Sequence, residues 1–276
     1  METGYARDVG GRAEQQDAVA VFASPDDTRH LLLVADGMGG HADGARASGT
    51  AMATAGRLWQ ACDGRPSDPA AFLDQIFRDT HEALCAEDRP PEARPGTTLV
   101  ALYVDGREAH WAHCGDSRLY HFEGPKPVSR TRDHTRVQEL LEAGQISEAE
   151  MGHHPAQNQL LQALGVVDSI RVDFGRAALG AGSRFLLCSD GFWEQISPAE
   201  MHALLESGNL QAGLEAWVNE AARRGGARGD NVAAAACRVH APDRRHWQQA
   251  LRATIHPLLA AGLLLLAALT ILFWPL

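Results

Sequence analysis

Several features that mark whole classes of protein are missing from this 276-residue sequence. Positive charge is scarce, since 25 lysines and arginines face 35 aspartates and glutamates, and a formal charge of −10 argues against binding to nucleic-acid phosphates. The five cysteines are odd in number and show no C-x-x-C spacing, which indicates reduced thiols in a cytoplasmic protein rather than a disulfide framework. Residues 1–12 are charged and glycine-rich and lack the apolar core of a signal peptide, so we expect none.

One long apolar run stands at the end of the chain. Residues 257–276 carry no charge, and about 20 such residues, at about 1.5 Å rise each, span a hydrocarbon core of about 30 Å. Arg244, Arg245 and Arg252 precede the run, and positive residues favour the cytoplasmic side of a membrane. We therefore expect a transmembrane helix that tethers a cytoplasmic domain. The alternative, a buried C-terminal helix, would usually have a polar face.

The rest of the sequence predicts one folded domain. We expect this domain over residues 1–240, a basic juxtamembrane linker over 241–256 and the transmembrane helix over 257–276. Strand-like runs precede and separate paired helical stretches without a strict β-α-β alternation, which favours an α+β fold. The expected strands are 18–23, 30–35, 98–104, 109–114, 118–122, 184–188 and 231–239. The expected helices are 44–62, 69–85, 134–143, 198–206 and 210–223, the fourth of them with Ser197 as its N-cap.

The apolar run 30–35 ends at Asp36, and four glycines, a histidine and a second aspartate follow. Three interpretations are open. Residues 37–42 fit the G-x-G-x-x-A pattern of dinucleotide-binding proteins, although no second strand with an acidic residue follows about 20 positions later. A tight turn with Asp36 as a capping residue would explain the same letters. Alternatively, Asp36 is a metal ligand, and a recurrence of the pattern elsewhere would support this.

The pairing of aspartate with glycine does recur where later strands end or begin. The three further instances are Gly115-Asp116, Asp190-Gly191 and Gly229-Asp230. Together with Asp36 they suggest carboxylates brought to one point, with glycines letting the backbone come close. Oxygen ligands of this kind suit Mg²⁺ or Mn²⁺. No histidine cluster competes in the sequence, because His110 and His113 fall on opposite faces of a strand.

These motifs belong to an ordered set that extends from Arg7 to Val239. The set comprises RAEQQD (12–17), VADGMGGHADGARAS (34–48), GTT (96–98), GDSR (115–118), DHT (133–135), SDG (189–191) and GDN (229–231). Each motif alone is weak, but in this order the chain resembles the bacterial metal-dependent type 2C protein serine/threonine phosphatases. The resemblance implies an α+β fold in which two antiparallel sheets pack face to face between helices, as four α-β-β-α layers. It also implies a metal cluster at one edge of the sandwich.

The resemblance assigns a role to each acidic residue of that cluster. Asp36 would bridge two Mn²⁺ or Mg²⁺ ions, with the Gly37 carbonyl on one of them, and the adjacent glycines would clear room for metals and phosphate. Asp190 and Asp230 would complete the shell of the other ion. Asp116 would join Asp190 at a third, weaker ion. Such an ion pair needs no covalent intermediate, and the absence of a C-x5-R motif argues against a cysteine nucleophile.

The resemblance also implies roles around the metals. Arg12 would hold the phosphate with its planar fork of donors, and Asp17 and Asn231 would orient metal-bound waters. The stretch Thr135 to Gly165 resembles the flap segment of bacterial members, which would influence substrate choice. Two surface helices and a loop would explain that stretch equally well.

Two departures from the family pattern bear on catalysis. Gln15 and Gln16 stand where the family usually has Asn and Glu, which removes one acid near the metals. Met38 stands where eukaryotic members place a histidine that protonates the leaving group. His41 is the nearest substitute, with a catalytic or substrate-contacting role, and a water molecule is the alternative.

The implied function is hydrolysis of phosphoserine and phosphothreonine in proteins. The enzyme would be a monomer in its catalytic domain, tethered to the bacterial cytoplasmic membrane, and would oppose a Ser/Thr kinase. A tethered pseudophosphatase that binds phosphoproteins without cleaving them is the alternative. Gln16 favours this alternative, whereas retention of Arg12 and of the aspartates argues against it. A third hypothesis, a nucleotide-binding oxidoreductase, is supported only by the pattern of residues 37–42.

Overall fold

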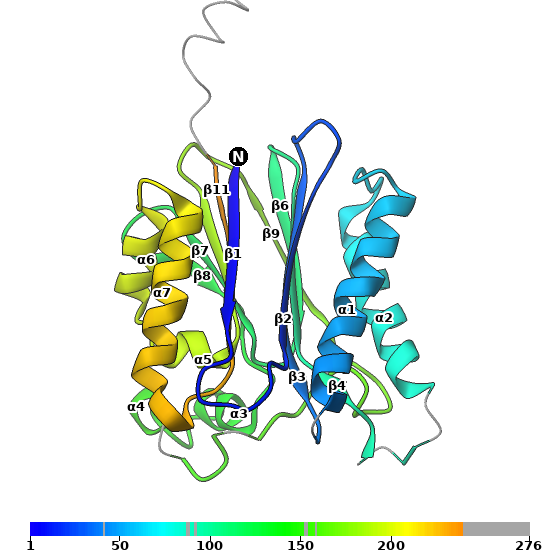
Figure 1. Cartoon of the computed structure of the whole chain (residues 1–276), viewed down its shortest axis with the longest axis vertical. Coiled ribbons are helices and arrows are strands. Elements are labelled where there is room, and N and C mark those ends of the chain that lie inside the picture. The colour runs from blue at the N-terminus through cyan, green and yellow to red at the C-terminus, as the bar shows by residue number, and fades with distance from the viewer. Residues whose placement is uncertain (41, 87–88, 91–92, 152–153, 158, 240–276) are drawn as a thin grey trace, which may run out of the picture. The chain divides into compact units, whose positions relative to one another are not determined.

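The computed structural model describes residues 1–40, 42–86, 89–90, 93–151, 154–157 and 159–239 (Figure 1). Residues Met1–Val239 form one compact unit. The linker predicted over 241–256 and the membrane helix predicted over 257–276 lie outside the described residues, so both stay predictions. Among the helices that are described, none has the length and hydropathy needed to cross a bilayer.

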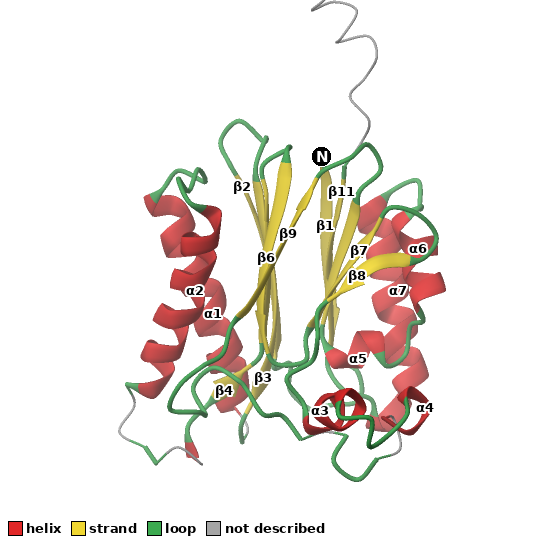
Figure 2. Ribbon diagram, turned by 180° about the vertical axis from the view of Figure 1, so that it is seen from behind, coloured by secondary structure: helices red, strands yellow, loops and turns green. Residues whose placement is uncertain are grey.

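Two antiparallel sheets face each other, and helices cover the outer face of each (Figures 1 and 2). The first sheet has the strand order β1 (Glu2–Asp8), β11 (Val232–Arg238), β10 (Arg184–Cys188), β7 (Arg118–Phe122) and β8 (Pro127–Arg130). The second has the order β2 (Asp17–Ala23), β3 (His30–Met38), β5 (Leu99–Val104), β6 (Glu108–Cys114) and β9 (Asp173–Ala178), and the short β4 (Gly96–Thr97) also pairs with β3. This arrangement confirms the expected α+β sandwich.

The helices fall into three groups (Figure 2). The second sheet is covered by α1 (Ala42–Ala61) and α2 (Pro69–Cys85), and the first by α6 (Pro198–Leu205) and α7 (Leu210–Gly225). The short helices α3 (Arg136–Glu142), α4 (Glu148–Met151) and α5 (Asp190–Trp193) lie at one end of the sandwich. A 3₁₀ turn, Gly226–Arg228, leads into the last strand. Helix α6 begins as predicted, because Ser197 and Glu200 form a reciprocal capping box.

Strand β3 explains why residues 30–35 read as a continuous apolar run. Its odd-numbered residues, such as Leu33, pack in a cluster with α1 and α2, whereas Leu32 and Val34 pack in the cluster between the sheets. Both faces of the strand are therefore buried. Side chains alternate along a strand, so Asp36 lies on the same face as Leu32 and Val34 and points into the space between the sheets.

The antiparallel pairing of β3 rules out the dinucleotide interpretation of residues 37–42. Strand β3 pairs antiparallel with β2 and with β5. A dinucleotide fingerprint requires a parallel β-α-β unit. The glycines after Asp36 therefore serve another purpose.

The sequence does not predict three strands at the sheet margins, β1, β8 and β9. Each is the outermost strand of its sheet. Along β1 only Gly4 is buried, and along β8 and β9 no residue is. Edge strands expose much of their surface, so their sequences lack the apolar runs that mark central strands.

Candidate metal centre

Asp36 is fixed by the two threonines of the GTT motif. The Asp36 N–H donates to Thr98 Oγ1 at 3.0 Å, and the Asp36 carbonyl accepts from the Thr98 N–H and from the Thr97 hydroxyl, both at 2.9 Å. Thr98 Oγ1 also lies 2.7 Å from Ser117 Oγ, which ties this strand end to the GDSR turn. The GTT motif thus acts through the backbone of Asp36.

Asp17 lies directly opposite Asp36 in the β2–β3 ladder and faces the same space. Its side chain is buried, and the Ser189 hydroxyl donates to Asp17 Oδ2 at 2.6 Å. Burial raises the pKa of Asp17 to about 7, although the Ser189 hydrogen bond opposes the shift. Asp17 therefore joins the second sheet, through Ser189, to the strand that leads to Asp190.

Asp190 and Asp230 come from the first sheet. Asp190 begins α5 directly after β10, and Asp230 precedes β11, so neighbouring strands deliver the two residues. The two segments that carry these residues approach each other closely, because a Cβ added to Gly191 would lie 2.1 Å from the Asn231 carbonyl oxygen. Only glycine allows α5 to lie against the segment that carries Asp230.

Asp116 lies in the turn between β6 and β7, where the chain crosses from the second sheet to the first. The Trp193 indole N–H donates to the Asp116 carbonyl at 3.1 Å, which holds the turn against α5. Burial, with the charge of Asp133 adding to it, raises the pKa of Asp116 to about 7.

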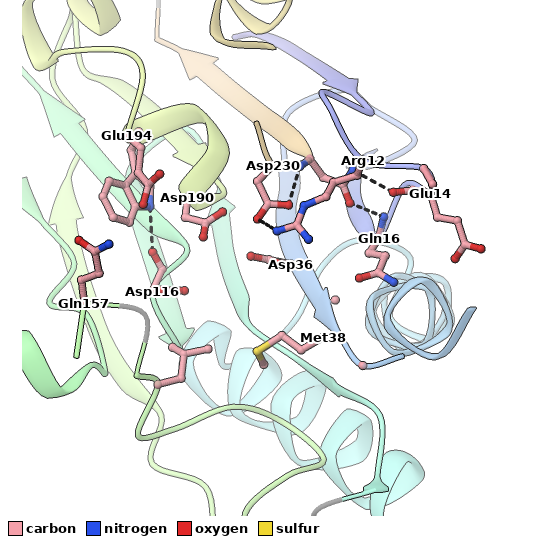
Figure 3. Close-up of a pocket in the computed structure, with 16 residues that line it drawn as sticks. Arg12, Glu14, Gln16, Asp36, Met38, Asp116, Gln157, Asp190, Glu194 and Asp230 are labelled. Carbon is pink, nitrogen blue, oxygen red and sulfur yellow. Dashed lines mark hydrogen bonds and ion pairs between the residues drawn. The ribbon is translucent and has the colours of Figure 1, made fainter. Parts of the chain in front are cut away.

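Asp36, Asp116, Asp190 and Asp230 line one pocket of about 560 Å³, and their side chains are directed toward a common space (Figure 3). Burial and the charges of neighbouring aspartates raise the pKa values of Asp36 and Asp190 well above the usual range. Among the described residues that line the pocket, Arg12 is the one cation. An oxygen donor set with unbalanced negative charge fits a hard divalent cation such as Mn²⁺ or Mg²⁺.

Arg12 lies at the rim of the pocket, on the loop between β1 and β2. Its Nη2 lies 2.5 Å from Asp230 Oδ2, and its side chain is 58% exposed. Asn231 holds this loop, because its Oδ1 accepts from the Gln16 N–H at 2.7 Å and its amide donates to two loop carbonyls at 2.8 and 3.0 Å. Sequence reasoning missed this loop-holding contact. The predicted contacts of Arg12 with phosphate and of Asn231 with metal-bound water stay predictions.

Gly37 has a packing role that the sequence did not predict, and its expected role in clearing room for metals and phosphate stays a prediction. A Cβ added there would lie 2.0 Å from the Gly44 carbonyl oxygen and 2.7 Å from that of Gln16. The glycine therefore lets the start of α1 and the β1–β2 loop close around the end of β3. The Gly37 N–H also donates to the Gln16 carbonyl at 3.2 Å. The role of the Gly37 carbonyl as a ligand stays a prediction.

Four further residues line the pocket that the sequence motifs do not single out: Trp193, Glu194, Gln157 and Leu160. Burial raises the pKa of Glu194, and the charge of Asp230 adds to the shift. A sequence signal existed for two of them, since Trp193 and Glu194 follow Asp190 by three and four residues and so share its face of a helical turn. Gln157 belongs to the flap-like stretch, where α3 and α4 form the two expected helices.

The GDSR and DHT motifs lock together behind the pocket. The Arg118 guanidinium donates from Nε and Nη2 to the Asp133 carboxylate at 2.9 and 2.6 Å and stacks 3.4 Å over the Trp193 ring. The His134 N–H donates to the Gly115 carbonyl at 3.0 Å, and His134 Nδ1 accepts from the Gly115 N–H at 3.2 Å. We call the Arg118–Asp133–Trp193 group the arginine clasp. Together these contacts hold the turn that carries Asp116.

A histidine cluster does exist, contrary to the expectation from the sequence. His113, His134 and Asp173 offer ligand atoms within 4.8 Å of one another. The two rings stack with centroids 4.8 Å apart and planes 29° apart, whereas a bound ion would have to lie in both ring planes. His134 Nδ1 also accepts a backbone N–H, so Nε2 carries the proton of the neutral ring and faces Asp173 at 3.2 Å. The cluster is better explained as a hydrogen-bonded network than as a metal site.

Of the residues that depart from the family pattern, some line the pocket and one binds backbone groups outside it. Met38 and Gln16 line the pocket. Gln15 turns away, donating to the Asp8 carbonyl at 2.8 Å and accepting from the Asp17 N–H at 2.9 Å. His41, the predicted proton donor, lies outside the described residues.

Comparison with known proteins identifies the family. Residues 7–229 match the family "Protein phosphatase 2C". Protein phosphatase PhpP of Streptococcus pneumoniae is 34% identical over 213 residues, which are 75% of this chain and 85% of that protein. Two solved structures have the same fold. The serine/threonine phosphatase of S. agalactiae has a TM-score of 0.77 and 28% identity, over 87% of this chain and 99% of that one.

The second structure is the catalytic domain of the serine/threonine phosphatase PstP in complex with two manganese ions. It has a TM-score of 0.73 and 30% identity, over 86% of this chain and 98% of that one. Its two ions agree with the predicted cofactor, Mn²⁺ or Mg²⁺, and with the carboxylate pocket described above. The chain therefore belongs to the bacterial protein phosphatase 2C family and is a metal-dependent phosphoprotein phosphatase.

Proposed function

We propose that the chain hydrolyses phosphoserine and phosphothreonine in proteins, at two divalent ions held by Asp36, Asp190 and Asp230. One observation carries the proposal: aspartates from both sheets share a pocket, and burial and the charges of neighbouring aspartates raise the pKa values of Asp36 and Asp190 there. A bound cation would relieve this repulsion. Asp116 would contribute, with Asp190, to a third ion.

The chemistry demands more than side chains alone supply. Enzymes accelerate phosphate-monoester hydrolysis by up to about 10²¹-fold, and general acid–base catalysis typically contributes about 10²–10⁴ of this. When bound, a pair of divalent ions activates water near neutral pH, neutralises the phosphate and aligns the displacement. The protein residues keep the ligands in place, with Asn231 and Gly191 fixing the segments around Arg12 and Asp230.

Substrate binding falls to Arg12 in this proposal. Its guanidinium pairs with Asp230 at the pocket rim, and its exposure leaves it accessible to an incoming phosphate. A planar guanidinium binds two phosphate oxygens at once. Arg12 would thus exchange a carboxylate for the substrate phosphate. Met38 has no proton to give, so the leaving group would take its proton from His41 or from water.

The cellular setting is the finer part of the proposal. A helix at 257–276 would tether the enzyme in a single pass to the bacterial cytoplasmic membrane, with a monomeric catalytic domain in the cytoplasm. Tethering raises the effective concentration near membrane-bound substrates, including those of a cognate Ser/Thr kinase. Fractionation of cells that express the full chain, or a chain lacking 257–276, tests the tether. Equal recovery of both proteins in the soluble fraction would contradict it.

The function is tested by the release of phosphate from a phosphothreonine peptide by the full chain in detergent. We expect turnover with Mn²⁺, none with EDTA, and none with Asp36→Asn in Mn²⁺. The control is Asp74→Asn, which makes the same change in an exposed pair with Arg78 on α2. A wild-type protein that is folded and loaded with Mn²⁺, binds the peptide and still fails to cleave it would identify the pseudophosphatase instead.

A further inference from the structure

A second hollow adjoins the metal pocket on the side of the first sheet. This side groove, of about 550 Å³, is lined by residues of β7, β8, α5 and the start of α6, elements that are labelled in Figure 2. Its lining residues are Arg118, Tyr120, Pro127, Arg130, Trp193, Glu194, Gln195, Ile196, Ser197, Pro198 and Glu200. Trp193 and Glu194 line the metal pocket as well, so the two hollows share a wall.

The shared wall is held from two directions. The Trp193 ring lies under the Arg118 guanidinium at 3.4 Å, and its N–H donates to the Asp116 carbonyl at 3.1 Å. Arg118 is itself held by Asp133 and donates to the Tyr120 hydroxyl at 3.1 Å. The Trp193 ring is therefore held in place at the boundary between the groove and the metal pocket. Rigid aromatic side chains bind a peptide with little loss of conformational entropy.

Arg130 gives the side groove a charge that the protein does not balance. Within the described part of the chain, its guanidinium has no ion-pair or hydrogen-bond partner, and the residue is exposed on β8 opposite Tyr120. Of the three other charged residues that line the groove, two are paired, and the third, Glu194, has no such partner among the described residues. Arg118 pairs with Asp133, and Glu200 pairs with Arg224 at 2.7 Å. Glu194 is shared with the metal pocket.

We propose that the side groove binds the substrate polypeptide on one side of the phosphorylated residue, and that Arg130 selects an acidic side chain there. This deepens the proposed function and rests on it. Two observations favour a peptide: the groove adjoins the metal pocket across Trp193 and Glu194, and its aromatic and proline lining suits a polypeptide chain. Charge complementarity with the Arg130 guanidinium favours an acidic residue at this position of the peptide.

The test uses phosphothreonine peptides that differ in one residue. An acidic residue is moved through the four positions on each side of the phosphothreonine, and each peptide is compared with its glutamine counterpart. With the wild-type full chain and Mn²⁺, we expect one register of acidic peptides to have the highest kcat/KM. Arg130→Gln should lower kcat/KM for those peptides about two- to fivefold, mainly through KM, and leave the glutamine peptides unchanged.

Charge reversal sharpens the test. Arg130→Glu should disfavour the acidic peptide about tenfold and should prefer a peptide with lysine at the same position. The control is Arg107→Gln, because Arg107 follows β5 at the end of the sandwich opposite to Asp36, as the pairing of Val104 with His30 requires. Equal losses with acidic and glutamine peptides, or an equal loss in Arg107→Gln, would overturn the proposal.

Turnover of a small aryl phosphate distinguishes an effect on the groove from an effect on the catalytic centre. It has no polypeptide to occupy the groove, so Arg130→Gln should leave its turnover unchanged, and a matching loss would overturn the groove proposal. If the wild-type protein cleaves neither aryl phosphate nor peptide, the proposed function fails. Fluorescence anisotropy of the labelled peptides then tests whether the groove binds them. Weaker binding of the acidic peptide to Arg130→Gln supports it, and equal binding overturns it.

Discussion

Two polar clusters lie side by side at the same end of the sandwich, and they differ in charge balance. The arginine clasp pairs the Arg118 guanidinium with the Asp133 carboxylate and an aromatic ring. The neighbouring metal pocket collects four aspartates, with Arg12 as the one cation among its described lining residues. Trp193 touches both clusters, through its ring on one side and its N–H on the other.

The difference separates structure from function. A buried polar group is tolerated when its partners are present, and the clasp supplies its own. The metal pocket does not, and the raised pKa values of Asp36 and Asp190 record the cost. A polar cluster that the protein leaves unbalanced indicates a ligand that the protein must bind. Substitutions in the two clusters should therefore have opposite effects on stability.

The largest effect is expected in the clasp. Asp133→Asn leaves the buried Arg118 charge without a counterion, and we expect the free energy of unfolding to fall by about 3–5 kcal/mol in urea titrations. Replacing both Arg118 and Asp133 by leucine should recover most of this loss, because no charge is then left buried. A loss below about 1 kcal/mol for Asp133→Asn would show that the clasp is not the structural cluster we describe.

In the metal pocket the same chemical change should affect catalysis. Asp190→Asn keeps an acceptor for the Gly191 N–H, which lies 2.6 Å from Asp190 Oδ1, but it removes one repelling charge. We expect kcat/KM with Mn²⁺ to fall by on the order of 10²–10³-fold. The free energy of unfolding in EDTA should stay the same or rise. Destabilisation as large as that of Asp133→Asn would remove the distinction between the clusters.

The smallest effect concerns pH. Asp17 has a pKa of about 7 in the folded protein against 3.8 as the reference value, so the folded state holds a proton that the unfolded state releases. Stability in EDTA should therefore fall as pH rises from 5 to 7, by about 2 kcal/mol from this group. Burial lowers the pKa of His134 to about 4, and this works in the opposite direction.

The contribution of Asp17 is isolated by comparison with Asp17→Asn. The variant keeps an acceptor for the Ser189 hydroxyl but cannot titrate, so its stability should fall less steeply over the same pH range. Thermal melts with EDTA and with Mn²⁺ provide the measurement. Identical pH slopes for the wild type and the variant would contradict the assignment.

The central part of the fold is readable from sequence because it is buried on both faces. Residues 30–35 and 184–188 form long apolar runs, and β3 and β10 appear where those runs lie. The marginal strands are not readable, because β1 and β9 are half exposed and take their conformation from the neighbouring strand. Here tertiary pairing overrides local propensity.

The site divides in the same way. Four aspartates could be found because each sits beside a glycine at a strand end, and the pocket brings these residues together. The roles of their neighbours could not be found, because they depend on contacts between distant segments. Gly37 gives room to a helix, and His113, His134 and Asp173 come together from three separate stretches. Among these neighbours, the sequence offered a signal only for those on the turn after Asp190, such as Glu194, which follows Asp190 at helical spacing.

The position of β11 has a consequence for the order in which the protein is made. β11 is the last strand described, yet it lies between β10 and β1, the first strand, and Asp230 stands at its start. Until β11 has left the ribosome, β1 has no neighbour in its sheet and the metal pocket lacks one of its walls. A nascent chain from which β11 is still missing therefore cannot complete the metal pocket. Activity begins only when the N-terminal and C-terminal ends of the domain meet.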